Sequence, residues 1–156
     1  MRVAFIGLGI MGLPQAHNLI KAGFALTACA RRKAQAEPLI ALGARYAATP
    51  AQAAQDAQVI ITMVAAPSDV EAVYFAADGV LASAAPNTLL IDMTTSSPKL
   101  AERIHAAAKT KQLRALDAPV TGGVKGAREG TLTILVGGDT EDFNATQPVL
   151  DAMGTT

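Results

Sequence analysis

Cysteine, histidine and aromatic residues are all scarce in this sequence of 156 residues. It holds a single cysteine, Cys29, and two histidines, and only 4% of its residues are aromatic. One cysteine excludes an internal disulfide and fits a reducing compartment, so we expect a cytoplasmic location. His17 and His105 stand alone in different predicted helices. This spacing offers no set of metal ligands, so we expect no metal site.

Charge is also sparse, because charged residues make up 17% of the chain and the formal net charge is zero. A neutral chain gives no support for binding nucleic acid or an anionic membrane surface. The longest apolar run, residues 59–66, has the length of a strand and is too short to cross a bilayer. The high hydrophobic content, 51%, is too great for disorder and is typical of a sheet covered on both faces.

Acidic residues are missing from the first part of the chain. None precedes Glu37, whereas five basic residues do, and these are Arg2, Lys21, Arg31, Arg32 and Lys33. We expect this uneven distribution to create a local positive field that attracts a polyanionic ligand.

Strand and helix patterns alternate along the whole sequence. Apolar runs predict strands at residues 3–6, 25–30, 44–47, 59–64, 88–92, 113–116 and 132–136. Helices are expected at residues 10–22, 34–42, from 50, from 67, 98–109 and 140–153, and a long loop at 117–130. This alternation predicts one α/β domain over residues 1–156, a Rossmann-type doubly wound, mostly parallel sheet with helices on both faces.

A glycine-rich turn stands between the first predicted strand and the first predicted helix. It reads Gly7-Leu8-Gly9-Ile10-Met11-Gly12, and in this context the spacing G-x-G-x-x-G indicates a dinucleotide site. The first glycine permits the tight turn, the second lets backbone approach a pyrophosphate, and the third lets helix and strand pack closely. The N–H groups at the helix start would face the phosphates. A plain glycine turn or a methyltransferase-type glycine loop is the alternative interpretation.

The end of the second predicted strand bears on which dinucleotide binds. A site for NAD usually places Asp or Glu about 20 residues after the glycines, to accept bonds from the ribose hydroxyls. Here the strand ends Ala30-Arg31-Arg32-Lys33. A carboxylate there would repel a 2′-phosphate, whereas a guanidinium can bind it with two hydrogen bonds. The sequence therefore favours NADP(H), with NAD(H) as the alternative.

Four stretches, in order along the chain, carry a family resemblance. They are FIGLGIMGLP at residues 5–14, IDMTT at 91–95, DAPVTGG at 117–123 and GTLTILVGG at 130–138. With these motifs the chain resembles the β-hydroxyacid dehydrogenase family. That family includes 3-hydroxyisobutyrate dehydrogenases and tartronate semialdehyde (2-hydroxy-3-oxopropionate) reductases, and is related to 6-phosphogluconate dehydrogenase.

The resemblance implies roles for further residues. Val64 and Ala65 would lie along the adenosine half of the cofactor, and Thr95 near the nicotinamide and its ribose. The substrate carboxylate would be held by Thr121, Gly122 and Gly123, since a hydroxyl and two unhindered backbone N–H groups can form an anion-binding nest. Without the resemblance, Thr95 is equally well a hydroxyl at a helix start and residues 121–123 a wide loop between strands.

Two residues depart from the pattern of the family. Thr121 stands where many members have serine, which keeps the hydroxyl. Ala30 stands where many NADP-using members have asparagine, which weakens the cofactor assignment without removing it.

The activity implied by the resemblance is hydride transfer between NADPH and a small semialdehyde or β-hydroxy acid. Family members continue into an all-helical domain that carries the catalytic lysine, so we expect that domain beyond Thr156 and assign no catalytic residue within the chain. The chain alone is then expected to be inactive or nearly so, and to self-associate through the surface that such a domain would cover. The alternatives are a stand-alone dinucleotide-binding module, or the cofactor domain of an imine reductase or a 6-phosphogluconate dehydrogenase relative.

Overall fold

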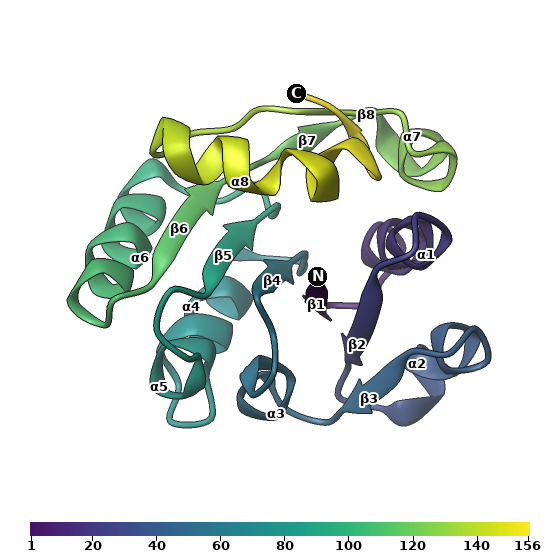
Figure 1. Cartoon of the computed structure of the whole chain (residues 1–156), viewed down its shortest axis with the longest axis horizontal. Coiled ribbons are helices and arrows are strands. Elements are labelled where there is room, and N and C mark those ends of the chain that lie inside the picture. The colour runs from purple at the N-terminus through teal and green to yellow at the C-terminus, as the bar shows by residue number, and fades with distance from the viewer.

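A six-stranded parallel sheet forms the centre of the molecule. The computed structural model describes residues 1–156, and its strands follow the order β3-β2-β1-β4-β5-β6 (Figure 1). Their bounds are β1 Arg2–Ile6, β2 Ala25–Cys29, β3 Arg45–Ala47, β4 Val59–Thr62, β5 Leu89–Asp92 and β6 Arg114–Asp117. All five neighbouring pairs are parallel. The strand order reverses between β1 and β4, so the carboxyl ends of these two strands form the switch point where such sheets bind ligands.

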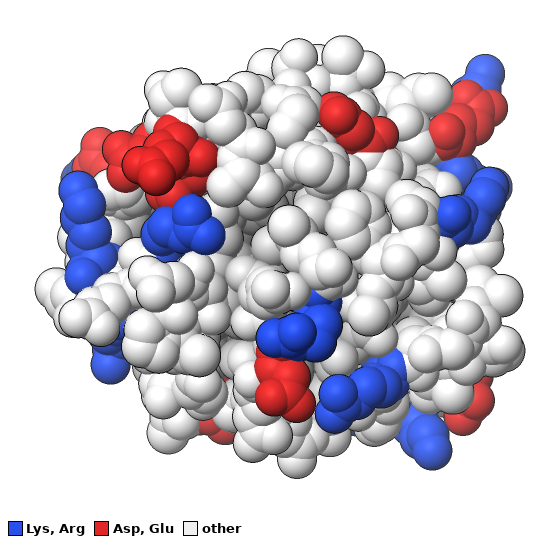
Figure 2. All heavy atoms as spheres, viewed as in Figure 1, with Lys and Arg blue, Asp and Glu red and all other residues white.

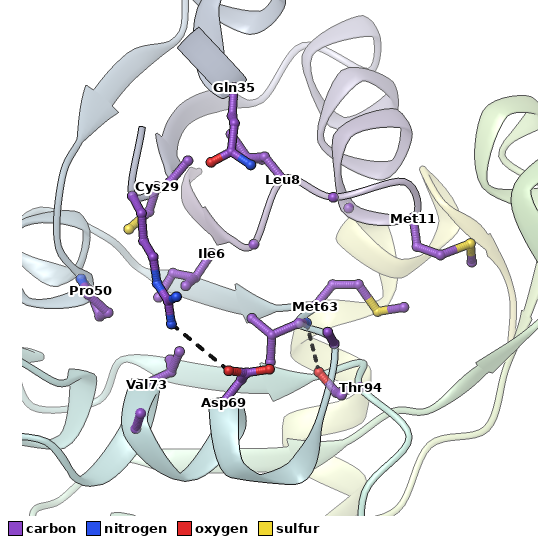
Figure 3. A pocket seen from close by; sticks show the side chains of 18 of the residues that line it. Ile6, Leu8, Met11, Cys29, Gln35, Pro50, Met63, Asp69, Val73 and Thr94 are labelled. Atoms are coloured by element: carbon purple, nitrogen blue, oxygen red, sulfur yellow. Dashed lines mark hydrogen bonds and ion pairs between the residues drawn. The ribbon is translucent and has the colours of Figure 1, made fainter. Parts of the chain in front are cut away.

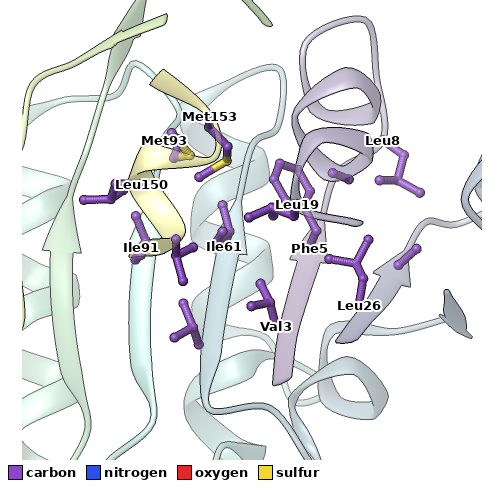
Figure 4. Packing of buried hydrophobic residues seen from close by; sticks show 14 of the residues in the cluster. Val3, Phe5, Leu8, Leu19, Leu26, Ile61, Ile91, Met93, Leu150 and Met153 are labelled. Atoms are coloured by element: carbon purple, nitrogen blue, oxygen red, sulfur yellow. The ribbon is translucent and has the colours of Figure 1, made fainter. Parts of the chain in front are cut away.

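Helices cover both faces of this sheet because its central strands, β1, β4 and β5, are buried on both sides. In β1, Val3 and Phe5 join one hydrophobic cluster, whereas Ala4 and Ile6 join the other. The first cluster, part of which Figure 4 shows, also takes side chains from α1 Gly12–Lys21, α2 Lys33–Ile40 and α8 Thr140–Asp151. The second takes side chains from α3 Pro50–Ala54, α4 Pro67–Phe75, α5 Val80–Ser83 and α6 Pro98–Thr110. The predicted fold class is therefore confirmed.

Local cap signals set the starts of several helices. Thr49 precedes α3 and its side chain accepts a hydrogen bond from the backbone N–H of Gln52 at 3.2 Å. Ser97 precedes α6 and accepts from the N–H of Leu100 at the same distance. In both helices a proline follows the cap, where its missing N–H costs no bond. Both starts match the sequence prediction.

The expectation of one long loop over residues 117–130 is wrong. This stretch contains strand β7, Val120–Thr121, and helix α7, Gly123–Glu129. Strand β7 pairs with β8, Leu132–Ile134, which also pairs with β9, Gly154–Thr155, in a separate three-stranded sheet. The strand expected at residues 132–136 therefore lies outside the main sheet.

The short helix α7 was missed because tertiary contacts, more than local propensity, stabilise it. Two of its seven residues, Gly123 and Gly126, are poor helix formers. A methyl group at Gly126 would lie 3.1 Å from the side chain of Leu132, so the glycine allows α7 to approach β8 closely. The side-chain amide of Asn18 in α1 also donates to the carbonyl of Ala127 at 2.8 Å.

Charged side chains form small, separate groups on the face seen in Figure 2, and most of that face is uncharged. None of the helices combines the length and the apolar character needed to cross a membrane.

Candidate functional site

A cleft of about 790 Å³ opens at the switch point, beside the carboxyl ends of β1, β2, β4 and β5. Its walls include most of the residues that the sequence singled out for cofactor binding, and Figure 3 shows two of them, Leu8 and Met11, at the cleft. These are Gly7, Leu8, Gly9, Ile10, Met11, Gly12, Arg31, Val64, Ala65 and Thr95. Arg32 is exposed and stays outside the lining, as do Thr121, Gly122 and Gly123. The structure thus brings ten of the predicted cofactor-binding residues together in the cleft. It leaves Arg32 and the three predicted substrate-binding residues outside the lining.

The three glycines of the turn meet different surroundings. Gly7 has a φ of +100°, which disfavours a side chain, and a methyl group there would also overlap the carbonyl oxygen of Met63. At Gly12 a methyl group would overlap the carbonyl of Gly7. At Gly9 it would meet no atom within 4 Å, and the residue is exposed to the cleft. The protein's own packing therefore requires glycine at 7 and 12, while position 9 keeps open space beside the turn.

The amino end of α1 brings unpaired N–H groups to the cleft. The backbone N–H groups of Ile10, Met11 and Gly12 donate to no acceptor in the protein. The first turn of α1 has no acidic residue, and Met11 at the N-cap supplies no side-chain hydrogen bond. The positive end of the helix dipole is therefore uncompensated, which suits the binding of phosphate groups.

The end of β2 places one guanidinium at the cleft. The side chain of Arg31 is 90% exposed, and its Nη2 lies 3.9 Å from Oδ1 of Asp69 in α4 (Figure 3). The other carboxylate oxygen of Asp69 accepts from the backbone N–H of Ala66 at 3.1 Å. An ion pair this exposed contributes about 1 kcal/mol at most, so Arg31 is free to turn towards an anionic ligand. The Tyr46 hydroxyl donates a hydrogen bond to the carbonyl of Ala30 at 2.9 Å.

Hydrogen bonds join the loops that follow β4 and β5. The backbone N–H of Val64 donates to the hydroxyl oxygen of Thr94 at 3.0 Å, as Figure 3 shows. The N–H of Thr94 in turn donates to Oδ1 of Asp92 at 3.0 Å. Burial raises the pKa of Asp92 from 3.8 to about 6, although the hydrogen bonds from Thr94 act in the opposite direction. The second carboxylate oxygen of Asp92 is buried without a partner.

Other ionisable groups near the cleft are held neutral by burial. Burial, assisted by the charge of Asp78, raises the pKa of the Cys29 thiol to about 12, so this thiol is a poor nucleophile. Burial and the charge of Asp92 raise the pKa of the Tyr74 hydroxyl. The cleft lining contains no lysine and no histidine, and no cluster of His, Cys, Asp or Glu in the molecule has the geometry of a metal site. The ionisable side chains of the lining are Cys29, Arg31, Asp69 and Asp78.

Residues 121–123 lie at the start of α7. All three are exposed, and Gly122 and Gly123 have φ angles of +127° and +64°. These left-handed conformations leave the backbone accessible, as an anion nest requires. Their role in substrate binding stays a prediction.

Several cleft residues were not anticipated from the sequence. They are Gln35, Thr49, Pro50, Asp69, Ala72, Val73, Asp78 and Thr94. Thr94 belongs to the motif that contains Thr95 and could have been chosen with it. The residues of α3 and α4 give no local signal, because only the packing of these helices beside β1 and β4 brings them to the cleft.

Comparison with known proteins adds independent findings. The family model for the NAD binding domain of 6-phosphogluconate dehydrogenase matches residues 2–156. The NAD-dependent L-serine dehydrogenase of Pseudomonas aeruginosa is 46% identical over 153 residues, which make up 98% of this chain and 51% of that protein. The chain spans about half the length of the curated relatives it matches.

Solved structures agree with these matches. The 3-hydroxyisobutyrate dehydrogenase of Mycobacterium tuberculosis, solved with L-serine, superposes with a TM-score of 0.91 at 38% identity, covering 98% of this chain and 52% of that one. Psf3 in complex with NADP⁺ and 2-OPP gives a TM-score of 0.93 at 32% identity, covering 99% and 55%. Solved imine reductases, at most 24% identical, share the fold alone.

Proposed function

We propose that this chain, which belongs to the family of 6-phosphogluconate dehydrogenase NAD-binding domains, binds NADP(H) as the cofactor-binding domain of an oxidoreductase. The observation that supports the proposal most directly is the open space at Gly9. A methyl group added there would have no protein atom within 4 Å. In the same turn, the backbone N–H groups of residues 10–12 have no acceptor in the protein. Together they supply the room and the donors that a pyrophosphate needs.

The preference for NADP(H) over NAD(H) rests on the end of β2. Arg31 lines the cleft, and no carboxylate follows β2 to accept bonds from the ribose hydroxyls. A guanidinium can instead donate two hydrogen bonds to a 2′-phosphate. Arg32 and Lys33 lie outside the cleft lining and would add positive field there. Relatives differ in this respect, since one is named NAD-dependent and another was solved with NADP⁺.

The nicotinamide of the bound cofactor would accept or supply the hydride, and this chain would bind and orient the cofactor. Met11, Thr95 and the Val64–Ala65 loop line the cleft along which the cofactor would lie. For the substrate we propose a small carboxylate-bearing aldehyde or hydroxy acid. Its carboxylate would bind at the Thr121 hydroxyl and the backbone of Gly122 and Gly123.

A complete active site would need groups that this chain does not supply. The cleft lining contains no lysine and no histidine, and we assign no group of this chain to the exchange of an alcohol proton. We propose that an all-helical second domain supplies the catalytic lysine and closes the cleft. The 156-residue chain should therefore bind cofactor and reduce semialdehydes very slowly or not at all.

A charge swap at Arg31 tests the cofactor assignment. Arg31→Asp should weaken NADPH binding about tenfold to a hundredfold, the worth of hydrogen bonds to a charged group. NADH binding should become the tighter of the two. Arg45→Asp serves as the control, because Arg45 is 73% exposed on β3 and lies outside the cleft lining. Equal NADPH affinity in wild type and Arg31→Asp, measured by isothermal titration, would contradict the assignment.

A non-catalytic dinucleotide-binding module is the second candidate, because the cleft carries phosphate-binding groups but no lysine or histidine. Adding a separately produced helical domain with the family lysine distinguishes the two. Semialdehyde reduction that appears only in the mixture supports the oxidoreductase. Tight NADPH binding with no turnover in the mixture supports the module.

A further inference from the structure

The chain of hydrogen bonds behind the cleft links two loops that the cofactor would touch. The backbone N–H of Val64 donates to the hydroxyl oxygen of Thr94, and the backbone N–H of Thr94 donates to the carboxylate of Asp92. Val64 and Thr94 both line the cleft, but Asp92 lies behind it on β5 and is only 5% exposed. The carboxylate therefore acts on the cleft through Thr94 without reaching the ligand.

The sheet does not need this carboxylate to hold the strands together. Backbone bonds already join the three strands here, because Met93 donates to the carbonyl of Thr62 at 2.8 Å and Ala118 donates to that of Asp92 at 2.7 Å. One oxygen of Asp92 has no partner at all. Burying a carboxylate with an unpaired oxygen costs folding free energy, so the stability of the fold does not explain why an acid stands at this position.

We propose that Asp92 is a positioning residue for the dinucleotide, which holds the loops after β4 and β5 at the spacing that the cofactor requires. The proposal rests on the function proposed above. As a carboxylate, Asp92 accepts a hydrogen bond from the backbone N–H of Thr94 and so fixes the position of this residue, whose hydroxyl oxygen accepts the Val64 N–H. Val64, Ala65 and Thr95 then keep fixed places around the cleft.

Protonation of Asp92 weakens this link, because a neutral acid accepts hydrogen bonds less strongly than a carboxylate. Two ionisable groups lie near it on the elements packed around it. Asp117 lies beside Asp92 on β6 and raises its pKa, and the charge of Asp92 in turn raises the pKa of the Tyr74 hydroxyl on α4. The carboxylate form is the major one at about pH 7.5 and the neutral form at about pH 5, on either side of a pKa of about 6.

Variants of Thr94 test the link while the charge stays in place. Thr94→Val removes the hydroxyl, keeps the shape and leaves the Val64 N–H unpaired, so NADPH binding should weaken about tenfold. Thr94→Ser keeps the hydroxyl and should bind nearly as wild type. The control is Thr88→Val, because the buried Thr88 hydroxyl donates to the Ala57 carbonyl just before β5 begins. This control should leave NADPH affinity unchanged.

Asp92→Asn tests the charge itself. The variant should bind NADPH more weakly than wild type at about pH 7.5, and the two should converge at about pH 5, where Asp92 is neutral. The 2′-phosphate of the ligand titrates in the same range, but it does so equally for both proteins. Amide exchange of the cofactor-free chain gives a second readout, in which Thr94→Val and Asp92→Asn should each lower the protection of the Val64 N–H.

The outcomes separate this proposal from the proposed function. Failure of wild type to bind either NADPH or NADH would overturn the function. Wild-type affinity retained in folded Thr94→Val, with unchanged protection at Val64, would overturn the positioning role alone. Should Thr94→Val not fold, the pH dependence of Asp92→Asn against wild type decides, and parallel pH profiles would refute the role of the charge.

Discussion

Two alanine substitutions in the glycine-rich turn should separate stability from cofactor binding. Gly12→Ala should lower the stability of the fold, whereas Gly9→Ala should leave the fold stable and weaken NADPH binding. Gly12→Ala places a methyl group against the carbonyl oxygen of Gly7, where the backbone must shift. Gly9→Ala places it in open space, and the φ of Gly9 is not in the left-handed region. One change therefore disturbs the fold, whereas the other intrudes only on a ligand.

The expected magnitudes follow from these surroundings. Overpacking against fixed backbone costs about 1–3 kcal/mol, and about 1 kcal/mol shifts the melting temperature of a domain this size by about 2–4 °C. Gly12→Ala should therefore melt about 2–12 °C below wild type. Gly9→Ala should gain about 0.4–1 kcal/mol, because alanine reduces the freedom of the unfolded chain at a compatible position. It should still bind NADPH at least about tenfold more weakly, since its methyl group occupies the path of the pyrophosphate.

Differential scanning calorimetry and NADPH titration on the same preparations measure both effects. Gly137→Ala is the matched control, because its added methyl group would approach only the Asp117 carbonyl, at 3.9 Å, and Gly137 lies outside the cleft lining. It should leave affinity unchanged. Gly9→Ala that binds NADPH as tightly as wild type would refute the reasoning, because the open space would then have no ligand to accommodate.

Three further predictions concern charge and association. Asp69→Asn keeps the acceptor for the Ala66 N–H but frees Arg31, so NADPH should bind up to about fivefold more tightly by titration, with NADH unchanged. Because the pKa of Asp92 is raised in the folded state from 3.8 to about 6, wild type loses stability from this group as the pH rises through about 6. Asp92→Asn should therefore be more stable in urea at neutral pH by up to about 3 kcal/mol, an advantage that vanishes towards pH 4; an equal difference at both pH values would contradict this. Ile10 and Leu135 are 76% and 61% exposed, so sedimentation should show concentration-dependent self-association, and a monomer at all concentrations would refute it.

The fold could be predicted from the sequence because its signals are local. The apolar runs of β1 and β4 are buried on both faces, and the caps Thr49 and Ser97 mark the helix starts directly. Helix α7 could not be predicted in this way. Its glycines disfavour a helix in isolation, and its stability comes from contacts with Leu132 and α1 that are distant in sequence.

The candidate site was predicted in part for a similar reason. The glycine turn and Arg31 follow strands β1 and β2 directly, so the topology alone brings them to the switch point. Asp69 reaches the cleft only because α4 packs beside β4. The carboxylate of Asp92 bonds only to Thr94 in its own loop, and it is Thr94 that makes the bond across to the loop after β4. Contacts between elements that are distant in the sequence produce no local pattern from which they could be predicted.

Direct titration of the purified 156-residue chain with NADPH and with NADH tests the central claim most directly. A cleft with Arg31 at its mouth and open space at Gly9 predicts saturable binding of one dinucleotide per chain, tighter for NADPH. Binding of neither dinucleotide at millimolar concentration would contradict the account of the cleft, and tighter binding of NADH would contradict the assignment of Arg31.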